Sequence, residues 1–147
     1  MALRNLRYDG DEILRKKSRA VAAVDNKIKI LMEDMVETMY ENEGIGLAAP
    51  QVGILKRVIV MDVEDGNVYK MVNPIIIKKS GEQTDQEGCL SVPERKGAVK
   101  RPMNVTVEYT DENGKETELE AEGILARCIC HEVDHLNGIL FTDRVEE

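Results

Sequence analysis

Apolar residues in the first third of the chain recur at the spacing of an α-helix. The pattern predicts a helix between Asp25 and Asn42, with Asp25 as its N-cap and Gly44 as its C-terminal stop. The apolar positions three or four residues apart are Ile28, Leu31, Met32, Met35 and Met39. We interpret this stripe as a face that packs into the core. A shorter helix is predicted from Asp11 to about Lys17.

Farther along, the apolar period changes from that of a helix to the alternation of β-strands. Two hairpins are predicted, one around an Asp-Gly turn and one around an Asn-Gly turn. Pro74 is expected to interrupt the return strand of the first hairpin, because proline cannot donate to a strand ladder. The expected strands and turns are Arg57–Val63, Asp65-Gly66, Val68–Lys78, Val105–Tyr109, Asn113-Gly114 and Glu116–Glu122.

The C-terminal part of the chain returns to helical spacing. From about Gly123, apolar residues lead into a segment that contains both histidines, and Gly138 is the expected stop of this helix. Helices and antiparallel hairpins in this order predict an α+β fold, with the C-terminal helix packed inside the sheets. The sequence shows no repeat or linker, so we expect one domain over residues 1–147.

Composition narrows the class of protein. With no Trp and a single Phe, Phe141, the core must be built from aliphatic side chains. The formal net charge of −8 argues against DNA binding, and we interpret the basic run Arg15, Lys16, Lys17 and Arg19 as a solvated helix end. The chain has no apolar stretch of membrane-spanning length and no signal-peptide core, so we expect a cytoplasmic protein without a membrane partner.

The two histidines of the chain, His131 and His135, stand four residues apart on either side of Glu132. On a helix, two such imidazoles face the same side and can share one metal ion, and the glutamate lies beside it without being a ligand. Two ligands and one general base are the arrangement of a hydrolytic metal site. The motif alone leaves open an ordinary amphipathic helix with partly buried histidines.

A catalytic divalent metal usually has three protein ligands, so a third has to be sought. A metzincin-type histidine is excluded, because Phe141 stands at its position. A thermolysin-like glutamate is disfavoured but stays open, because the acids after His135 follow too soon for a second helix. Cys128 shares the helix face of the histidines, yet three ligands from one helix fit a tetrahedral metal poorly. Cys89 can approach from another part of the chain, unless it is a buried apolar thiol.

Three segments of the chain together resemble the motifs of the peptide deformylases. Gly44–Gln51 is similar to their GxGxAAxQ motif, Glu87–Ser91 to EGCLS and His131–Gly138 to HExDHLxG. The segments occur in the family's order and at about its spacing, so the resemblance covers essentially the whole chain. The chain departs from the family at Cys130, where glutamine is frequent, and at Asp85, where some members carry an apolar residue.

The resemblance implies a bacterial-type polypeptide deformylase. Such an enzyme removes the N-formyl group from the formylmethionine of newly synthesised polypeptides and releases formate. Cys89, His131 and His135 would hold one divalent metal with water as a further ligand. This metal would be Fe²⁺ in the cell, and Zn²⁺, Ni²⁺ or Co²⁺ could substitute for it.

The resemblance also assigns catalytic and binding roles. Glu132 would be the general base and then the acid for the leaving amine, and the Leu90 N–H and the Gln51 side chain would stabilise the oxyanion. The substrate is implied to lie along backbone segments and in a pocket for methionine. The residues implied to bind it are Ile45, Gly46, Gly88, Ile124, Arg127 and Cys128.

The implied partners are N-formylmethionyl nascent peptides, and we expect a monomer. Longer family members carry a C-terminal helix associated with ribosome binding, so a transient ribosome contact of this chain, which ends at Glu147, would use another surface. Two other functions are considered. A small HExxH metalloendopeptidase would need a third ligand other than cysteine. A structural zinc module would be closed by four protein ligands and would leave Glu132 idle.

Overall fold

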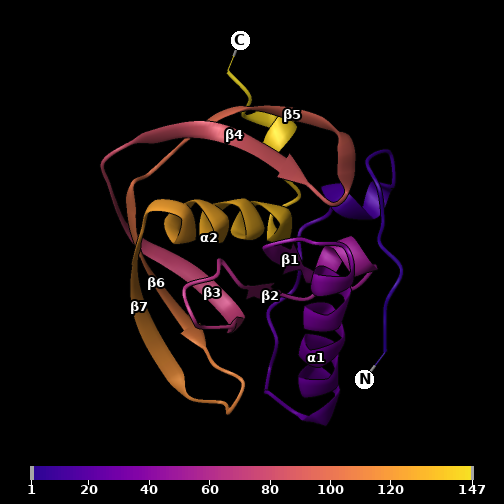
Figure 1. The fold of residues 1–147 in the computed structure, drawn as a ribbon. Helices are drawn as coiled ribbons and strands as arrows, with labels where there is room; N and C mark the ends of the chain where they lie inside the picture. The colour runs from indigo at the N-terminus through magenta and orange to yellow at the C-terminus, as the bar shows by residue number, and fades with distance from the viewer. Residues whose placement is uncertain (1, 147) are drawn as a thin grey trace.

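The computed structural model of the chain describes residues 2–146, and Figure 1 shows its fold. The α-helices are α1 (Asn26–Glu41) and α2 (Gly123–Leu136). The strands are β1 (Gly46–Ala48), β2 (Val58–Met61), β3 (Tyr69–Ser80), β4 (Gln83–Cys89), β5 (Val92–Arg101), β6 (Asn104–Thr110) and β7 (Glu116–Glu122). Short 3₁₀ helices are η1 (Glu12–Arg15), η2 (Ala49–Val52) and η3 (Phe141–Asp143). The strands form a five-stranded antiparallel sheet in the order β1-β2-β3-β6-β7 and a separate hairpin of β4 and β5.

The long N-terminal helix forms as predicted. The Asp25 side chain caps α1 by accepting a hydrogen bond from the Ile28 N–H at 3.0 Å, and the apolar stripe is buried. The predicted stop at Gly44 is wrong, because the chain turns one residue earlier, at Glu43 with φ 58°. Gly44 instead lies against Leu90, where a Cβ would come within 2.7 Å of Leu90 Cδ1. The glycine therefore serves a close approach to the strand hairpin.

Both predicted hairpins are confirmed, as β2–β3 and β6–β7. The Asn-Gly turn forms with Gly114 at φ 79°. Strand β3, however, runs through Pro74 without the expected interruption. The register with β6 shifts between Val72 and Ile75, and Asn73 has φ 53°, so a β-bulge accommodates the proline. The short predicted N-terminal helix is the 3₁₀ helix η1, capped by Asp11.

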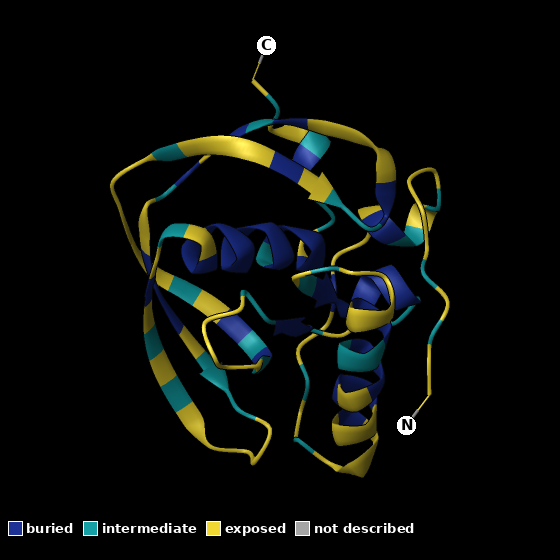
Figure 2. Cartoon of the chain, in the orientation of Figure 1, coloured by how far each residue is buried: buried dark blue, intermediate teal, exposed yellow. Residues whose placement is uncertain are grey.

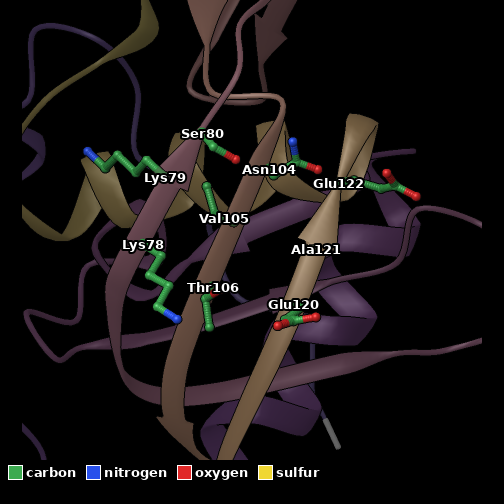
Figure 3. A pocket seen from close by; sticks show the side chains of 9 residues that line it. All are labelled: Lys78, Lys79, Ser80, Asn104, Val105, Thr106, Glu120, Ala121 and Glu122. Atoms are coloured by element: carbon green, nitrogen blue, oxygen red, sulfur yellow. The ribbon is translucent and has the colours of Figure 1, made fainter.

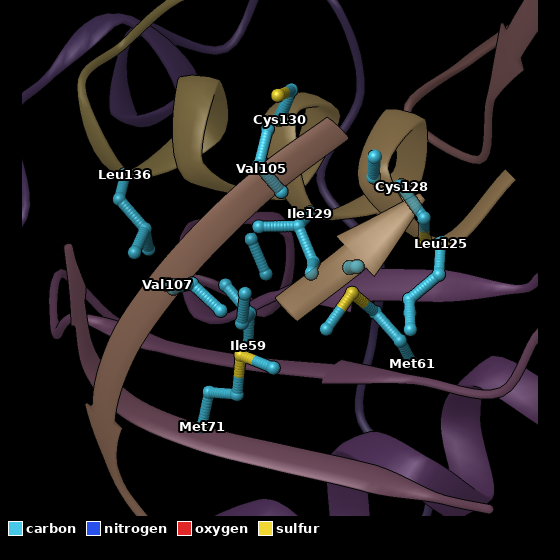
Figure 4. Packing of buried hydrophobic residues seen from close by; sticks show 13 residues of the cluster. Ile59, Met61, Met71, Val105, Val107, Leu125, Cys128, Ile129, Cys130 and Leu136 are labelled. Carbon is cyan, nitrogen blue, oxygen red and sulfur yellow. The ribbon is translucent and has the colours of Figure 1, made fainter. Parts of the chain in front are cut away.

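Helix α2 lies between the two sheets, with the β4–β5 hairpin over one side and the five-stranded sheet on the other (Figure 1). Eleven of its residues are buried, so nearly the whole helix is dark in Figure 2. On the sheet side, Leu125 and Ile129 pack with Ile59, Met71 and Val107 (Figure 4). The predicted α+β fold, with antiparallel sheets around the C-terminal helix, is confirmed.

Two regular segments near the site have no counterpart in the sequence prediction. The residues around Cys89 form the end of β4, where Cys89 pairs with Val92 of β5. In the glycine- and alanine-rich segment after α1, Gly46–Ala48 forms the short strand β1, which pairs with β2. Both segments border helix α2 and therefore bring backbone to the site.

Candidate metal centre and catalytic cleft

Three candidate metal ligands meet where the β4–β5 hairpin approaches helix α2. Cys89 is the last residue of β4, and His131 and His135 lie one turn apart on α2. One ligand atom from each residue lies within 4.8 Å of the other two. The Cys89 Sγ is 3.4 Å from the His135 Nε2, and the two imidazole centroids are 5.0 Å apart. The structure thus brings Cys89 to the two histidines from a different element.

These donors fit a divalent transition metal. One thiol and two imidazoles leave a tetrahedral ion one position for a further ligand. The His131 Nδ1–H donates to the Glu87 Oε1 at 2.9 Å, which leaves Nε2 as the ring nitrogen available to a metal. Burial lowers the pKa of His135 well below its usual value, so this imidazole is neutral. Burial alone would also lower the pKa of His131, but the hydrogen bonds to Cys89 and Glu87 raise it to about 10, so a metal ion would displace a proton from this ring.

Glu132 lies beside the ligand cluster without joining it. The residue is 3% exposed, and its Oε1 makes no hydrogen bond to any of the described residues. Burial raises the pKa of Glu132 to about 7, against the opposing attraction of His131. Gly46 faces this carboxylate, and a Cβ at Gly46 would also lie 2.8 Å from the Cys128 Sγ. A carboxyl group of this kind can accept and return a proton near neutral pH.

Gln51 lies next to the thiol of the cluster. Its Oε1 accepts the Ala48 N–H at 3.0 Å, which directs its Nε2 toward the hairpin. The Nε2 donates to the Ser91 Oγ at 3.0 Å and lies 3.5 Å from the Cys89 Sγ. Leu90 follows Cys89 directly, at the turn between β4 and β5. The two predicted oxyanion donors therefore lie on neighbouring segments beside the ligands.

Glu87 contacts a candidate ligand, although the sequence pattern assigned it no role. Its buried carboxylate accepts two hydrogen bonds of 2.9 Å from Arg101, one from Arg127 and one from His131. Burial alone would raise the pKa of Glu87, but the hydrogen bonds from Arg101 and His131 lower it to about 2. An ionised carboxylate on Nδ1 fixes the orientation of a ligating imidazole. Glu87 is two residues before Cys89 on one strand, and this same-face spacing could have indicated it.

Two other charged residues of α2 face this network. Arg127, expected to border a methionine pocket, donates to Glu87 and to the Val99 carbonyl at 3.1 Å. Asp134 is buried and accepts hydrogen bonds from Arg101 and Arg144. The departure from the family at Cys130 lies away from the ligands, because this thiol is buried among the residues that pack α2 onto the sheet (Figure 4).

A cleft of about 890 Å³ opens over the three candidate metal ligands. Two aliphatic side chains along it are strongly exposed, Ile45 at 45% and Ile124 at 55%. The cleft is lined by all of the sequence-predicted site residues except His135, which is buried. These lining residues are Ile45, Gly46, Gln51, Gly88, Cys89, Leu90, Ile124, Arg127, Cys128, His131 and Glu132.

A second hollow, of about 630 Å³, lies over strands β3, β6 and β7. Figure 3 shows side chains such as Lys78, Thr106 and Glu120 spread along these strands. This hollow contains none of the predicted site residues and has no cysteine or histidine in its lining. The candidate ligands and the predicted catalytic residues therefore do not belong to this hollow.

The cluster of one cysteine and two histidines beside a buried glutamate defines a metal-dependent hydrolase. The family model described as polypeptide deformylase matches residues 3–147. The chain belongs to the polypeptide deformylase family.

Close relatives cover nearly the whole chain. Peptide deformylase 1 of Clostridium perfringens is 58% identical over 144 residues, which are 97% of this chain and 98% of that protein. The peptide deformylase of Alkaliphilus metalliredigens is 56% identical over 99% of this chain and 98% of its own. The crystal structure of peptide deformylase from Thermotoga maritima matches with a TM-score of 0.95 at 42% identity, over 99% of each chain. The crystal structure of a peptide deformylase from Synechococcus elongatus in complex with actinonin matches with a TM-score of 0.94 at 48% identity, over 97% of this chain and 79% of that chain.

The predicted resemblance to the peptide deformylases is thus confirmed, and with it the reaction class. The chain is a metal-dependent hydrolase that removes N-formyl groups from nascent peptides. Family membership sets aside the metalloendopeptidase and the structural zinc module. Within residues 2–146, the helices are too short or too polar to cross a membrane.

Proposed function

We propose that Cys89, His131 and His135 hold one divalent cation and that Glu132 is the general base of deformylation. The observation that carries this proposal is the approach of three ligand atoms to within 4.8 Å of one another, beside a buried carboxylate oxygen without a partner among the described residues. When bound, the cation polarises the formyl carbonyl and lowers the pKa of a water molecule toward about 7.

The chain's own groups account for the proton transfers and for the developing charge. Glu132 takes the proton of the attacking water and returns it to the leaving amine of the methionine. The Gln51 Nε2 and the Leu90 N–H donate to the oxygen of the former formyl carbonyl. The support for Gln51 is its amide orientation, fixed by the hydrogen bond from the Ala48 N–H at 3.0 Å. Each donor of this kind is typically worth about 2.7–4 kcal/mol in the transition state.

We further propose that the peptide binds as an added strand along β1. Strand β1 is the last strand of its sheet, and it pairs with β2 on one side only. The backbone of Ile45, Gly46 and Gly88 along the cleft can therefore pair with an extended peptide. The methionine side chain is proposed to lie in the part of the cleft bordered by the remaining predicted binding residues, Ile124, Arg127 and Cys128.

We propose Fe²⁺ as the metal in the cell, with Zn²⁺, Ni²⁺ and Co²⁺ as possible replacements. A thiolate and two imidazoles can bind all four ions, and geometry and metal availability decide which ion such a site holds in the cell. We place the reaction in the cytoplasm, where formylated chains are synthesised. A monomeric state and a transient ribosome contact stay predictions.

Formate release from a formyl-Met peptide by anaerobically prepared, Fe²⁺-loaded protein tests the proposal. Glu132→Gln should retain the fold and the metal but fall to a small residual turnover, because the amide cannot accept the proton. Cys89→Ala should lose both the metal and the activity. A Cys89→Ala protein that still binds metal and releases formate would refute the ligand assignment. Equal turnover of Glu132→Gln and the wild type would refute the assignment of the base.

A further inference from the structure

A chain of charged hydrogen bonds reaches from the C-terminal segment to a ligand of the proposed metal site. Arg144 donates to both oxygens of Asp134, from Nε at 2.6 Å and from Nη2 at 3.1 Å. Asp134 also accepts from the Arg101 Nη1 at 2.7 Å. Arg101 donates two hydrogen bonds of 2.9 Å to the Glu87 carboxylate, and Glu87 also accepts a hydrogen bond from the His131 Nδ1 at 2.9 Å. We call this sequence of five residues the relay.

The central members of the relay share the same oxygen atoms, since each carboxylate oxygen accepts two hydrogen bonds. Arg101 Nη2 and His131 Nδ1 both donate to the Oε1 of Glu87. Arg101 and Arg144 likewise share the Oδ2 of Asp134. Because Arg101 is 4% exposed, water cannot readily replace a protein acceptor that it loses. A displacement of Arg101 would therefore also displace the Glu87 carboxylate that accepts from the His131 Nδ1.

The same C-terminal segment is also attached to the hairpin that carries the cysteine ligand. Val145 forms an antiparallel bridge with Val99 of β5, and the Glu146 N–H donates to the Ala98 carbonyl at 2.8 Å. The β4–β5 hairpin is a separate two-stranded sheet, so such contacts help to define its position over α2. Arg144, one residue earlier, binds the helix itself. The segment thus contacts both elements that supply metal ligands.

We propose that Arg144 is a positioning residue of the metal centre. Its paired contact holds Asp134 in the orientation that keeps Arg101 in place, and through Glu87 this maintains the imidazole of His131 ready to bind metal. The inference rests on the proposed function of His131 as a ligand. Loss of outer hydrogen-bond partners of a metal-binding histidine typically weakens metal affinity by about 10–100-fold. For Arg144, at the far end of the relay, we expect about tenfold.

Metal affinity measured by chelator competition tests this role, with Zn²⁺ and Co²⁺ on the purified full chain. Arg144→Ala should bind both ions about tenfold more weakly and should shift the Co²⁺ absorption bands, which report ligand geometry. Arg144→Lys restores the charge but not the two-pronged contact, and it should recover part of the affinity. Urea unfolding of the metal-free proteins separates this effect from a loss of overall stability.

Arg15→Ala is the matched control. Arg15 pairs with Asp143 in the same segment and has a similar side-chain exposure, 47% against 44% for Arg144, but it makes no contact with the relay. A merely structural role would lower metal-free stability in both variants and leave the affinity of the folded protein unchanged. A folded Arg144→Ala protein with the metal affinity and the Co²⁺ absorption bands of the wild type would overturn this inference and leave the proposed function intact. Absence of metal binding by the wild type would overturn the proposed function as well.

Discussion

Replacement of Gly46 by alanine should abolish most of the catalysis and leave the metal ligands in place. Gly46 lies on β1 opposite the carboxylate of Glu132, and a Cβ there would overlap the Glu132 Oε2 and lie 2.8 Å from the Cys128 Sγ. Gly46 does not have a positive φ angle, so an alanine at this position introduces no backbone strain of its own. The whole perturbation therefore falls on the two side chains that border the cleft.

The size of the effect follows from the displacement that the methyl group requires. To restore an ordinary van der Waals distance, the Glu132 carboxylate has to retreat by about 1 Å, a misplacement that can cost roughly 100-fold in rate. Expressed as a free energy, a 100-fold loss of kcat/KM is about 2.7 kcal/mol. The three atoms nearest to the new methyl group belong to Glu132 and Cys128 and not to a candidate ligand. Metal content should accordingly stay close to that of the wild type.

Formate release from a formyl-Met peptide, alongside metal analysis and urea unfolding, measures this prediction. A double-mutant cycle supplies the control: in a Glu132→Gln background the carboxylate has no catalytic role left to disturb, so Gly46→Ala should cost little further activity. Two results would refute the reasoning. One is a folded, metal-loaded Gly46→Ala enzyme with turnover within about threefold of the wild type. The other is an equal 100-fold loss in both backgrounds, which would place the damage in peptide binding.

Three other predictions concern charge and metal. Glu87→Gln leaves buried Arg101 with a weakened partner, so the free energy of unfolding in urea should fall by about 3–5 kcal/mol. The affinity for zinc should fall by about 10–100-fold, and an unchanged affinity would contradict the role of Glu87 in orienting the imidazole. The hydrogen bond from Arg15 lowers the pKa of Asp143, so Asp143→Asn should lose at most about 1 kcal/mol at pH 7. This difference should disappear as the pH falls through the lowered folded-state pKa, and a difference that grows in acid would be inconsistent. Removal of metal present at 100 times its Kd should lower the free energy of unfolding by about 2.7 kcal/mol, and identical urea midpoints with and without chelator would exclude this linkage.

The sequence predicts best those elements that bury one apolar face. Helix α1 and the hairpins β2–β3 and β6–β7 show the helical or alternating period because one side of each packs into the core. Strand β5 lacks this signal, because Pro93, Glu94, Arg95 and Lys96 are all exposed in succession. Its packing depends on a few residues, such as Val92 and Val99, in a small separate cluster. A strand that is held mainly by pairing with its neighbour shows little alternation of apolar and polar residues in its sequence.

In the candidate site, too, the sequence reveals some of the residues and not others. The ligand types and the glutamate are recognisable because metal chemistry restricts them to a few side chains at fixed spacing. The supporting charges are not, because Arg101 meets Glu87 and Asp134 across 14 and 33 residues of chain. An arginine and an aspartate at such separations look like surface residues in the sequence. Only the packing of the hairpin over α2 turns them into a buried network.

Helix α2 carries seven buried ionisable side chains. Two are the thiols Cys128 and Cys130, and the other five differ in the hydrogen bonds that they make. Arg127, His131 and Asp134 each meet an opposite charge or an acceptor within the protein. The Oε1 of Glu132 has no such partner among the described residues. A buried polar atom left without a hydrogen bond costs about 1–3 kcal/mol. Among the described residues of α2, the Arg127 Nη2 and the His135 Nδ1 are also buried without a hydrogen bond, so what sets Glu132 apart is that its unpaired atom is an acceptor oxygen beside the candidate ligands. Glu132 also lines the cleft in which we propose that the formyl group of a nascent peptide binds.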